Sequence, residues 1–163
     1  MIIRKVEIKD ALQIAEIYNF YIKNTHHSFE IEPIISEEMH ERIAATSENY
    51  PFLVAEEAGE ILGYAYASFY KSRSAYKNSV EVSVYVKNNL KQKGIGTKLY
   101  ERLFEELSKM KVHAIIAGIA LPNESSIKLH EKFGMEKVAH FREVGFKFGL
   151  WIDVAYWELI NKM

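Results

Sequence analysis

The feature that most limits the fold is a strand pattern that runs into a glycine loop and then directly into a helix. Valines alternate with other residues from 80 to 86, and a period of two gives a strand two different faces. Gly94 and Gly96 follow, and the apolar residues after them recur at helical spacing. Glycines let backbone N–H groups approach an anion closely, and a helix N-terminus adds unpaired donors and a positive dipole end. This segment therefore predicts a phosphate-binding loop.

Two familiar phosphate-binding motifs do not fit this loop. A P-loop ends in Gly-Lys-Ser/Thr, whereas the second glycine here precedes Thr97. A dinucleotide-binding fingerprint needs a third glycine where this chain has Leu99. Lysines surround the loop at positions 87, 91, 93 and 98. They suit a small polyphosphate better than a duplex backbone, although a solvated face gives the same cluster.

Periodicity along the rest of the chain predicts an α/β fold. Strands are expected near residues 2–8, 52–55, 61–66, 80–86, 112–119, 135–142 and 150–159. Helices are expected after the N-cap residues Asp10 and Ser36, around Leu99 to Leu107, and over 123–133, where Gly134 ends the last helix. This order is typical of a mixed sheet flanked by helices. Because the chain has no repeat or linker, residues 1–163 are expected to form a single domain.

Composition excludes several classes of function. The absence of cysteine rules out disulfides, thiolate metal sites and a cysteine nucleophile. A formal net charge of -1 provides no global positive field for a nucleic acid. The N-terminus lacks the order of a signal peptide, and the apolar stretch 114–121 is far shorter than the roughly 18 residues of a membrane span. We therefore expect a cytoplasmic protein with neither a nucleic-acid nor a membrane partner.

The glycine loop resembles the pyrophosphate-binding motif of the GNAT superfamily of N-acetyltransferases, Arg/Gln-x-x-Gly-x-Gly/Ala. Here the motif is Lys91-x-x-Gly94-x-Gly96, with Lys91 in place of the usual Arg or Gln. The segment 121–135 resembles the superfamily's Asn-x-x-(Ser/Ala)-x-x-Leu-Tyr-Glu-Lys-x-Gly-Phe motif. The resemblance implies a GNAT-like acyl-CoA N-acyltransferase fold, with a mixed central sheet of about seven strands and acetyl-CoA as the co-substrate.

The same resemblance implies a set of cofactor-binding residues. In the family the motif's Asn, here Asn123, contacts the pantetheine arm, and its Tyr often protonates the departing CoA thiolate. His130 takes that Tyr position, and histidine can donate a proton near neutral pH. Backbone N–H groups near Val84 to Val86 are expected to polarise the thioester carbonyl. The implied set is Val84, Tyr85, Val86, Lys91, Gln92, Lys93, Gly94, Ile95, Gly96, Thr97, Asn123 and Ser126.

Glu81 interrupts a valine-rich strand, although glutamate is disfavoured in strands. One interpretation is that the strand has a solvent face on which Glu81 lies. The other is a general base that deprotonates the attacking ammonium, directly or through a water. Direct attack on the thioester needs no covalent enzyme intermediate, which agrees with the missing cysteine.

Over about residues 3–157 the chain resembles the phosphinothricin N-acetyltransferase group, whose members also act on methionine sulfoximine and methionine sulfone. Among the landmarks are Arg73-x-Ala75-Tyr76 and the segment from Gly145 to Val154. This resemblance implies a homodimer, Glu81 as the general base and a small-molecule amine as the substrate. The fork of an arginine suits a carboxylate or a phosphinate. The implied substrate-binding residues are Phe29, Lys71, Arg73 and Tyr76.

Some positions leave the acceptor open. Glu30 and Phe148 depart from the herbicide-detoxifying members of the group, and Trp151, Tyr156 and Trp157 are expected in packing or a dimer contact. Another amine, such as a polyamine, an amino acid or a protein N-terminus, remains an alternative acceptor. A non-catalytic acetyl-CoA sensor and a purely structural partner protein are further alternatives. The other five histidines offer no metal-ligand spacing, so no metal is expected.

Overall fold

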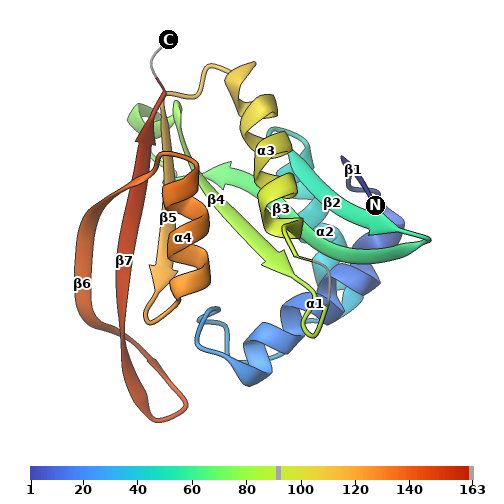
Figure 1. Cartoon of the computed structure of the whole chain (residues 1–163), viewed down its shortest axis with the longest axis horizontal. Helices are drawn as coiled ribbons and strands as arrows, with labels where there is room; N and C mark the ends of the chain where they lie inside the picture. The colour runs from blue at the N-terminus through green and yellow to red at the C-terminus, as the bar shows by residue number, and fades with distance from the viewer. Residues whose placement is uncertain (91–92, 162–163) are drawn as a thin grey trace. The chain divides into compact units, whose positions relative to one another are not determined.

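In the computed structural model, which describes residues 1–90 and 93–161, the expected order of strands and helices is confirmed (Figure 1). The strands are β1 (Ile2–Lys5), β2 (Phe52–Glu57), β3 (Glu60–Phe69), β4 (Ser79–Val86), β5 (Ala114–Ala120), β6 (Glu136–Lys147) and β7 (Leu150–Ile160). The helices are α1 (Ala11–Asn24), α2 (Ser36–Ser47), α3 (Ile95–Ser108) and α4 (Glu124–Lys132), with short 3-10 helices at Ile8–Asp10 and Ser74–Tyr76.

The strands follow the order β1-β2-β3-β4-β5-β7-β6 in a seven-stranded sheet. It is a mixed sheet, because β4 and β5 pair in parallel while β2 with β3 and β5 with β7 are antiparallel. The chain divides into two compact units. The first contains Met1–Phe20, Ile34–Ser68 and Val82–Lys111, and the second contains Tyr21–Pro33, Phe69–Glu81 and Val112–Met163. The division falls within β4, so this strand supplies residues to both units.

The first unit is built around the hairpin of β2 and β3. Ala58 and Gly59 form its turn with φ angles of 51° and 85°, the conformation of two-residue turns that match strand twist. Helix α3 packs against β1 and β2. Its fully buried leucines are Leu99, Leu103 and Leu107. In β3, a Cβ added to Gly63 would lie 2.8 Å from the backbone oxygen of Tyr85, so the close approach of β4 requires glycine here.

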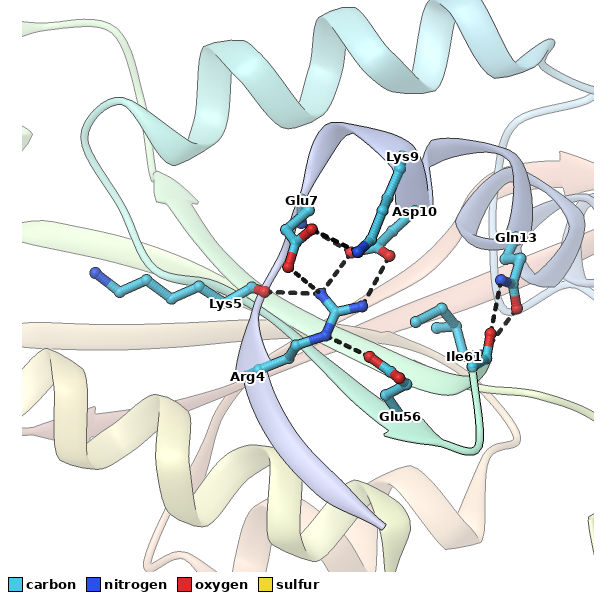
Figure 2. Close-up of polar contacts among 9 residues, drawn as sticks. Arg4, Lys5, Glu7, Lys9, Asp10, Gln13, Glu56 and Ile61 are labelled. Carbon is cyan, nitrogen blue, oxygen red and sulfur yellow. Dashed lines mark hydrogen bonds and ion pairs between the residues drawn. The ribbon is translucent and has the colours of Figure 1, made fainter.

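A buried carboxylate ties the N-terminal strand to the first turn of the chain (Figure 2). Asp10 accepts hydrogen bonds from Arg4 Nη1 and Nη2 at 2.7 and 2.9 Å, and from the backbone N–H of Glu7 at 2.8 Å. Arg4 Nε also donates to Glu56 of β2 at 2.5 Å. Burial alone raises the pKa of Asp10, but the hydrogen bonds from Arg4 and Glu7 outweigh it, so the pKa is lowered from its ordinary value.

Two helix starts differ from the expected caps. Asp10 ends the 3-10 helix Ile8–Asp10, and its side chain bonds back to Glu7 instead of forward into α1. Ser36 is the first residue of α2, with Ile35 as its N-cap, and the Ser36 hydroxyl donates to Glu37. Both residues lie at the predicted boundaries, but nearby partners take up their side chains.

The second unit contains β5, β7 and β6 together with α4. The hairpin of β6 and β7 turns at Phe148 and Gly149, with φ angles of 52° and 73°. Trp157 of β7 is buried, and its indole N–H donates to Glu131 of α4 at 3.4 Å. The packing role expected for Trp157 therefore agrees with its position. Among the described residues, no helix is both long enough and apolar enough to cross a membrane.

Replacing Asp10 with asparagine should lower the free energy of unfolding by about 2 kcal/mol at pH 7, because charge-assisted hydrogen bonds are lost. The folded-state pKa of Asp10 is lowered, so its contribution is present above the unfolded-state pKa and is lost as the pH falls through the folded-state pKa. Urea unfolding at several pH values measures both effects. The exposed Lys9–Glu7 pair provides a control, since Lys9→Ala should leave the free energy of unfolding close to the wild-type value. An unchanged Asp10→Asn stability at pH 7 would contradict this account.

Candidate active site

Glu81 lies in β4 between two buried valines. Val80 and Val82 are buried, so the period of the strand directs Glu81 to the opposite face. The Glu81 side chain is partly buried, and burial raises its pKa above the ordinary value. Within the described residues, no group hydrogen-bonds or ion-pairs with its carboxylate. A partly desolvated carboxylate without a protein partner is well suited to act as a general base.

Two residues on β5 and β7 lie next to Glu81. Gly118 of β5 is exposed, and a Cβ added to it would lie 3.6 Å from Glu81 Oε1. Tyr156 of β7 is the register partner of Gly118, and its ring carbon Cε1 would lie 3.1 Å from the same Cβ. The sequence predicts packing or a dimer contact for Tyr156, whereas the structure places it beside the candidate base. A glycine inside a strand is the sequence signal for such a close approach, but Tyr156 carries no signal because its position depends on strand register.

The glycine loop opens α3 in the first unit. Gly94 is the N-cap, with φ 83° and ψ 6°, in the left-handed region that favours glycine. The first helical hydrogen bond runs from Lys98 N to Gly94 O at 3.0 Å. The amides of residues 95–97 consequently have no acceptor within the helix. Ile95 is buried and anchors the loop to the unit's core, which leaves a short row of N–H donors of the kind that binds phosphate.

The other residues expected on the donor side lie around this loop and in β4. Val84, Tyr85 and Val86 form the end of β4, and the Tyr85 ring packs edge-on against Tyr18 at a centroid distance of 5.1 Å. Lys93 is exposed beside the loop. Of the surrounding lysines, Lys87 forms an ion pair with Glu60, so its charge is partly neutralised by that carboxylate. The predicted residues Lys91 and Gln92 lie outside the described residues.

The start of α4 brings Asn123 and Ser126 together. Asn123 is the N-cap, and its Oδ1 accepts from Ser126 N at 3.2 Å and from the hydroxyl of Ser125 at 3.1 Å. This capping explains why an asparagine begins the helix. The capping bonds use the oxygen of the amide, and its NH₂ group can still donate to a ligand.

His130 is buried one turn further along α4. Its Nδ1 lies 2.7 Å from the backbone oxygen of Ser126, so Nδ1 carries a proton and a neutral ring has its lone pair on Nε2. Burial lowers the pKa of His130 and the bond to Ser126 only partly opposes this. The neutral imidazole therefore dominates near pH 7.

The loop before β4 gathers aromatic rings around Lys71. Lys71 Nζ lies 5.0 Å from the ring centre of Tyr70 and 5.6 Å from that of Tyr76, and the two rings pack edge to face at 5.6 Å. Tyr70 and Lys71 also influence the pKa of Tyr156. Two predicted substrate residues, Lys71 and Tyr76, are thus brought together, with Tyr70 as a member that the sequence did not indicate. Arg73 is exposed at the N-cap of the 3-10 helix Ser74–Tyr76.

Phe29, the fourth predicted substrate residue, lies in a loop held by β6. A Cβ added to Gly145 would lie 2.4 Å from the Phe29 ring, so the ring contacts the backbone of β6 directly. Lys147 is buried, and its Nζ donates to the backbone oxygen of Ser28 at 2.6 Å. Burial lowers the pKa of Lys147. No sequence pattern indicates that this lysine anchors the loop, because lysines are ordinarily exposed.

Among residues 1–90 and 93–161, no group of three or more histidine or carboxylate side chains is placed to hold a metal ion. The first unit contains the amides at the start of α3, which have no acceptor within the helix, and the second unit contains the partly buried carboxylate of Glu81. Amides of this kind can bind a phosphate, and a carboxylate of this kind can act as a base.

The chain matches known acetyltransferases over nearly its whole length. Residues 3–156 match the family described as an acetyltransferase (GNAT) domain. The phosphinothricin N-acetyltransferase of Streptomyces coelicolor is 40% identical over 154 residues, which cover 92% of this chain and 90% of that protein. The L-methionine sulfoximine/L-methionine sulfone acetyltransferase of Salmonella typhimurium is 34% identical, with 98% and 94% covered. A solved acetyltransferase from S. typhimurium with acetyl-CoA superposes with a TM-score of 0.95 at 33% identity, covering 99% and 94%.

The mixed sheet, the glycine loop at α3 and these matches together define the class of the protein as an acetyltransferase. The chain belongs to the GNAT acetyltransferase family. The fold and the family expected from the glycine loop and the 121–135 segment are therefore confirmed.

Replacing Gly145 with alanine should displace Phe29 and lower the free energy of unfolding by about 1–3 kcal/mol, because the new methyl group overlaps the ring. In a Phe29→Ala background the same substitution should cost less than about 0.5 kcal/mol, since Gly→Ala without a clash is neutral or stabilising. Denaturant unfolding of the four proteins gives the coupling between the two positions. Equal costs in both backgrounds would show that Phe29 does not rest on Gly145.

Proposed function

We propose that residues 1–163 act as one N-acetyltransferase domain that moves acetyl from acetyl-CoA to the amine of a small amino-acid-like acceptor. Acceptors of the phosphinothricin, methionine sulfoximine or methionine sulfone type are favoured by the names of the relatives, and the cytoplasm is the expected location. The observation that carries the proposal is the partly buried carboxylate of Glu81, which has a raised pKa and no partner among the described residues. It stands in a chain whose family transfers acetyl groups.

Glu81 is proposed to take a proton from the acceptor's ammonium, directly or through one water. The freed nitrogen attacks the thioester carbonyl, a C–N bond forms, the C–S bond breaks, and CoA leaves as a thiolate. The newly acetylated nitrogen then releases a second proton, which balances the negative charge of the thiolate. Burial raises the pKa of Glu81, which brings the base closer to the operating pH and makes the first transfer less unfavourable. No covalent enzyme intermediate is needed, in keeping with a chain that contains no cysteine.

The donor is proposed to bind through backbone amides. Its pyrophosphate would accept hydrogen bonds from residues 94–97 at the start of α3, where the helix leaves these donors without internal acceptors. The Asn123 amide would contact the pantetheine arm, and the end of β4 at Val84 to Val86 would polarise the thioester carbonyl. Acetyl-CoA in the solved relative from S. typhimurium supports this choice of donor.

His130 is proposed as the proton donor for the CoA thiolate. Near neutral pH its ring is mainly neutral, because burial lowers its pKa and Nδ1–H binds the Ser126 oxygen. Nε2 must gain a proton before it can donate one. We therefore expect His130 to contribute less to the rate than Glu81, since solvent can also supply this proton.

The acceptor is proposed to be bound by two cationic side chains and by two aromatic side chains. Lys71 and Arg73 carry cations for a carboxylate or phosphinate, and the planar fork of Arg73 can bind two oxygens at once. Tyr76 and Phe29 would form the walls, with Tyr76 already packed around Lys71 and Phe29 seated on Gly145.

Glu81→Gln keeps the size of the side chain but cannot accept a proton. It should lower acetyl transfer about 10²- to 10⁴-fold while the dissociation constant for acetyl-CoA changes less than about twofold. Wild-type kcat/KM should fall as the pH is lowered through the raised pKa of Glu81, and the variant should lack this limb. The measurement is thiol release from acetyl-CoA with L-phosphinothricin, L-methionine sulfoximine, methionine sulfone, spermidine and a short peptide.

Turnover on the sulfoximine, the sulfone or phosphinothricin supports the proposed acceptor. Turnover confined to spermidine or the peptide would keep the reaction and replace the acceptor. Acetyl-CoA binding with no transfer to any amine, unaffected by Glu81→Gln, would contradict catalysis and favour a sensor. If acetyl-CoA also failed to raise the melting temperature, the donor site itself would be refuted.

We also propose a homodimer that uses the hairpin of β6 and β7. Large apolar side chains are exposed along this hairpin, and exposed apolar patches commonly mark protein–protein interaction sites. They are Val138, Phe141, Val144, Phe146, Phe148, Leu150 and Trp151. Phe146 and Trp151 also pack on each other at a ring distance of 4.8 Å. These two rings therefore form one continuous apolar surface.

Trp151→Glu should convert the dimer to a monomer, because a buried unpaired carboxylate is costly at an interface. Sedimentation equilibrium of the wild-type protein and the variant measures the mass. Ile35→Glu is the matched control, since Ile35 is just as exposed, at 65%, but lies outside the hairpin. A monomeric wild-type protein, or a dimer that tolerates Trp151→Glu, would contradict the proposed interface.

A further inference from the structure

Gly118 is a glycine inside a strand, at a position that solvent reaches. Glycine weakens a strand interior and is usually explained by a bulge or a close approach. Here the added Cβ would lie 3.1 Å from Cε1 and 3.4 Å from Cζ of Tyr156, and 3.6 Å from Oε1 of Glu81. Any side chain here would therefore crowd the Tyr156 ring, and glycine leaves its backbone exposed between that ring and the Glu81 carboxylate, a place that we call the notch.

Tyr156 packs its ring against a neighbouring aromatic side chain, and its hydroxyl makes no hydrogen bond to the described residues. The ring packs edge-on against Phe141 at a centroid distance of 5.8 Å. Within the described residues, no hydrogen bond is made by the hydroxyl, and it is not a fully buried atom. Burial raises its pKa, and the charges of Glu81 and Tyr70 add to this while Lys71 opposes it. These interactions place the phenol near the candidate base and near the charges of Tyr70 and Lys71.

A role in packing alone explains only part of this arrangement. The close Tyr156 ring explains why position 118 has no side chain, since an added Cβ would lie 3.1 Å from Cε1. Packing does not explain why the position next to Glu81 stays open to solvent, or why the ring carbon that bears the hydroxyl is one of the two nearest to Gly118. A polar group bordered by a carboxylate and a phenol oxygen would find two acceptors there.

We propose that the notch over Gly118 receives the amine of the acceptor, and that Tyr156 is a positioning and specificity-determining residue whose hydroxyl oxygen accepts a hydrogen bond from that amine. The inference rests on the proposed acetyl transfer. One N–H of the ammonium points to Glu81, which takes the proton, and a second is held by Tyr156. Gly118 provides room for the nitrogen and its substituent. Tyr156 takes no proton itself, so it fixes the direction of the nitrogen lone pair without acting as the base.

Tyr156→Phe and Gly118→Ala test the two parts of the proposal. Tyr156→Phe retains every ring atom and should lower kcat/KM for the best acceptor about tenfold through the loss of one hydrogen bond. Its acid limb in the pH profile should stay at the wild-type pH, unlike that of Glu81→Gln. Gly118→Ala should raise the acceptor KM at least about tenfold, because the methyl group enters the notch. In both variants the KM for acetyl-CoA should stay within about twofold of the wild-type value.

Tyr50→Phe, a partly buried tyrosine of the first unit, is the matched control and should retain wild-type kinetics. Melting temperatures separate folding defects from kinetic ones, and Tyr156→Phe carries the test if Gly118→Ala is unstable. Wild-type acceptor kinetics in Tyr156→Phe, or a loss of acetyl-CoA affinity equal to the loss for the acceptor, would overturn the inference alone. If the wild-type protein acetylates no amine in the panel, the proposed function fails first and the inference falls with it.

Discussion

Alternation along β4 buries Val80 and Val82 and so directs Glu81 to the other face of the sheet. The rest of the candidate site depends on this placement. A carboxylate on the valine face would need a buried partner, whereas one on a fully solvated face would keep an ordinary pKa. Glu81 has neither environment, because it is partly buried and has no partner among the described residues.

Three glycines determine the shape of the candidate site as much as its larger residues do. Gly94 permits the left-handed turn that opens α3, whose first amides have no acceptor within the helix. Gly145 lets the Phe29 ring rest on the backbone of β6, and Gly118 leaves the notch beside Glu81. Backbone conformation requires glycine at position 94, whereas the close approach of an aromatic ring requires it at positions 145 and 118. Only the role of Gly94 is visible in a short motif, because the other two glycines depend on residues distant in sequence.

Local patterns predicted the order of elements, the glycine at the start of α3 and a strand around Glu81, since each depends on neighbours along the chain. Long-range features were not predictable in the same way. Tyr156 reaches Gly118 through the register of β5 with β7, and Lys147 is buried against the Ser28 oxygen although it reads as a surface lysine. Helix caps failed for a related reason. Asp10 and Ser36 mark the correct boundaries, but Arg4 and the Glu7 amide bind the first side chain and Glu37 binds the second.

The electrostatics of Glu81 favour a cationic acceptor over a neutral one. Burying part of a carboxylate without a counter-ion is unfavourable, and the raised pKa records that cost. An ammonium group bound beside Glu81 would supply the missing charge, so acceptor binding itself relieves the desolvation. A fixed lysine or arginine at that point would relieve it in advance, lower the pKa of the base and repel the ammonium. Lys71, the cation whose charge is felt by the adjacent Tyr156, is instead associated with the rings of Tyr70 and Tyr76. Under the proposed function, the anionic end of the acceptor would meet the charge of Lys71, and its amine would meet Glu81.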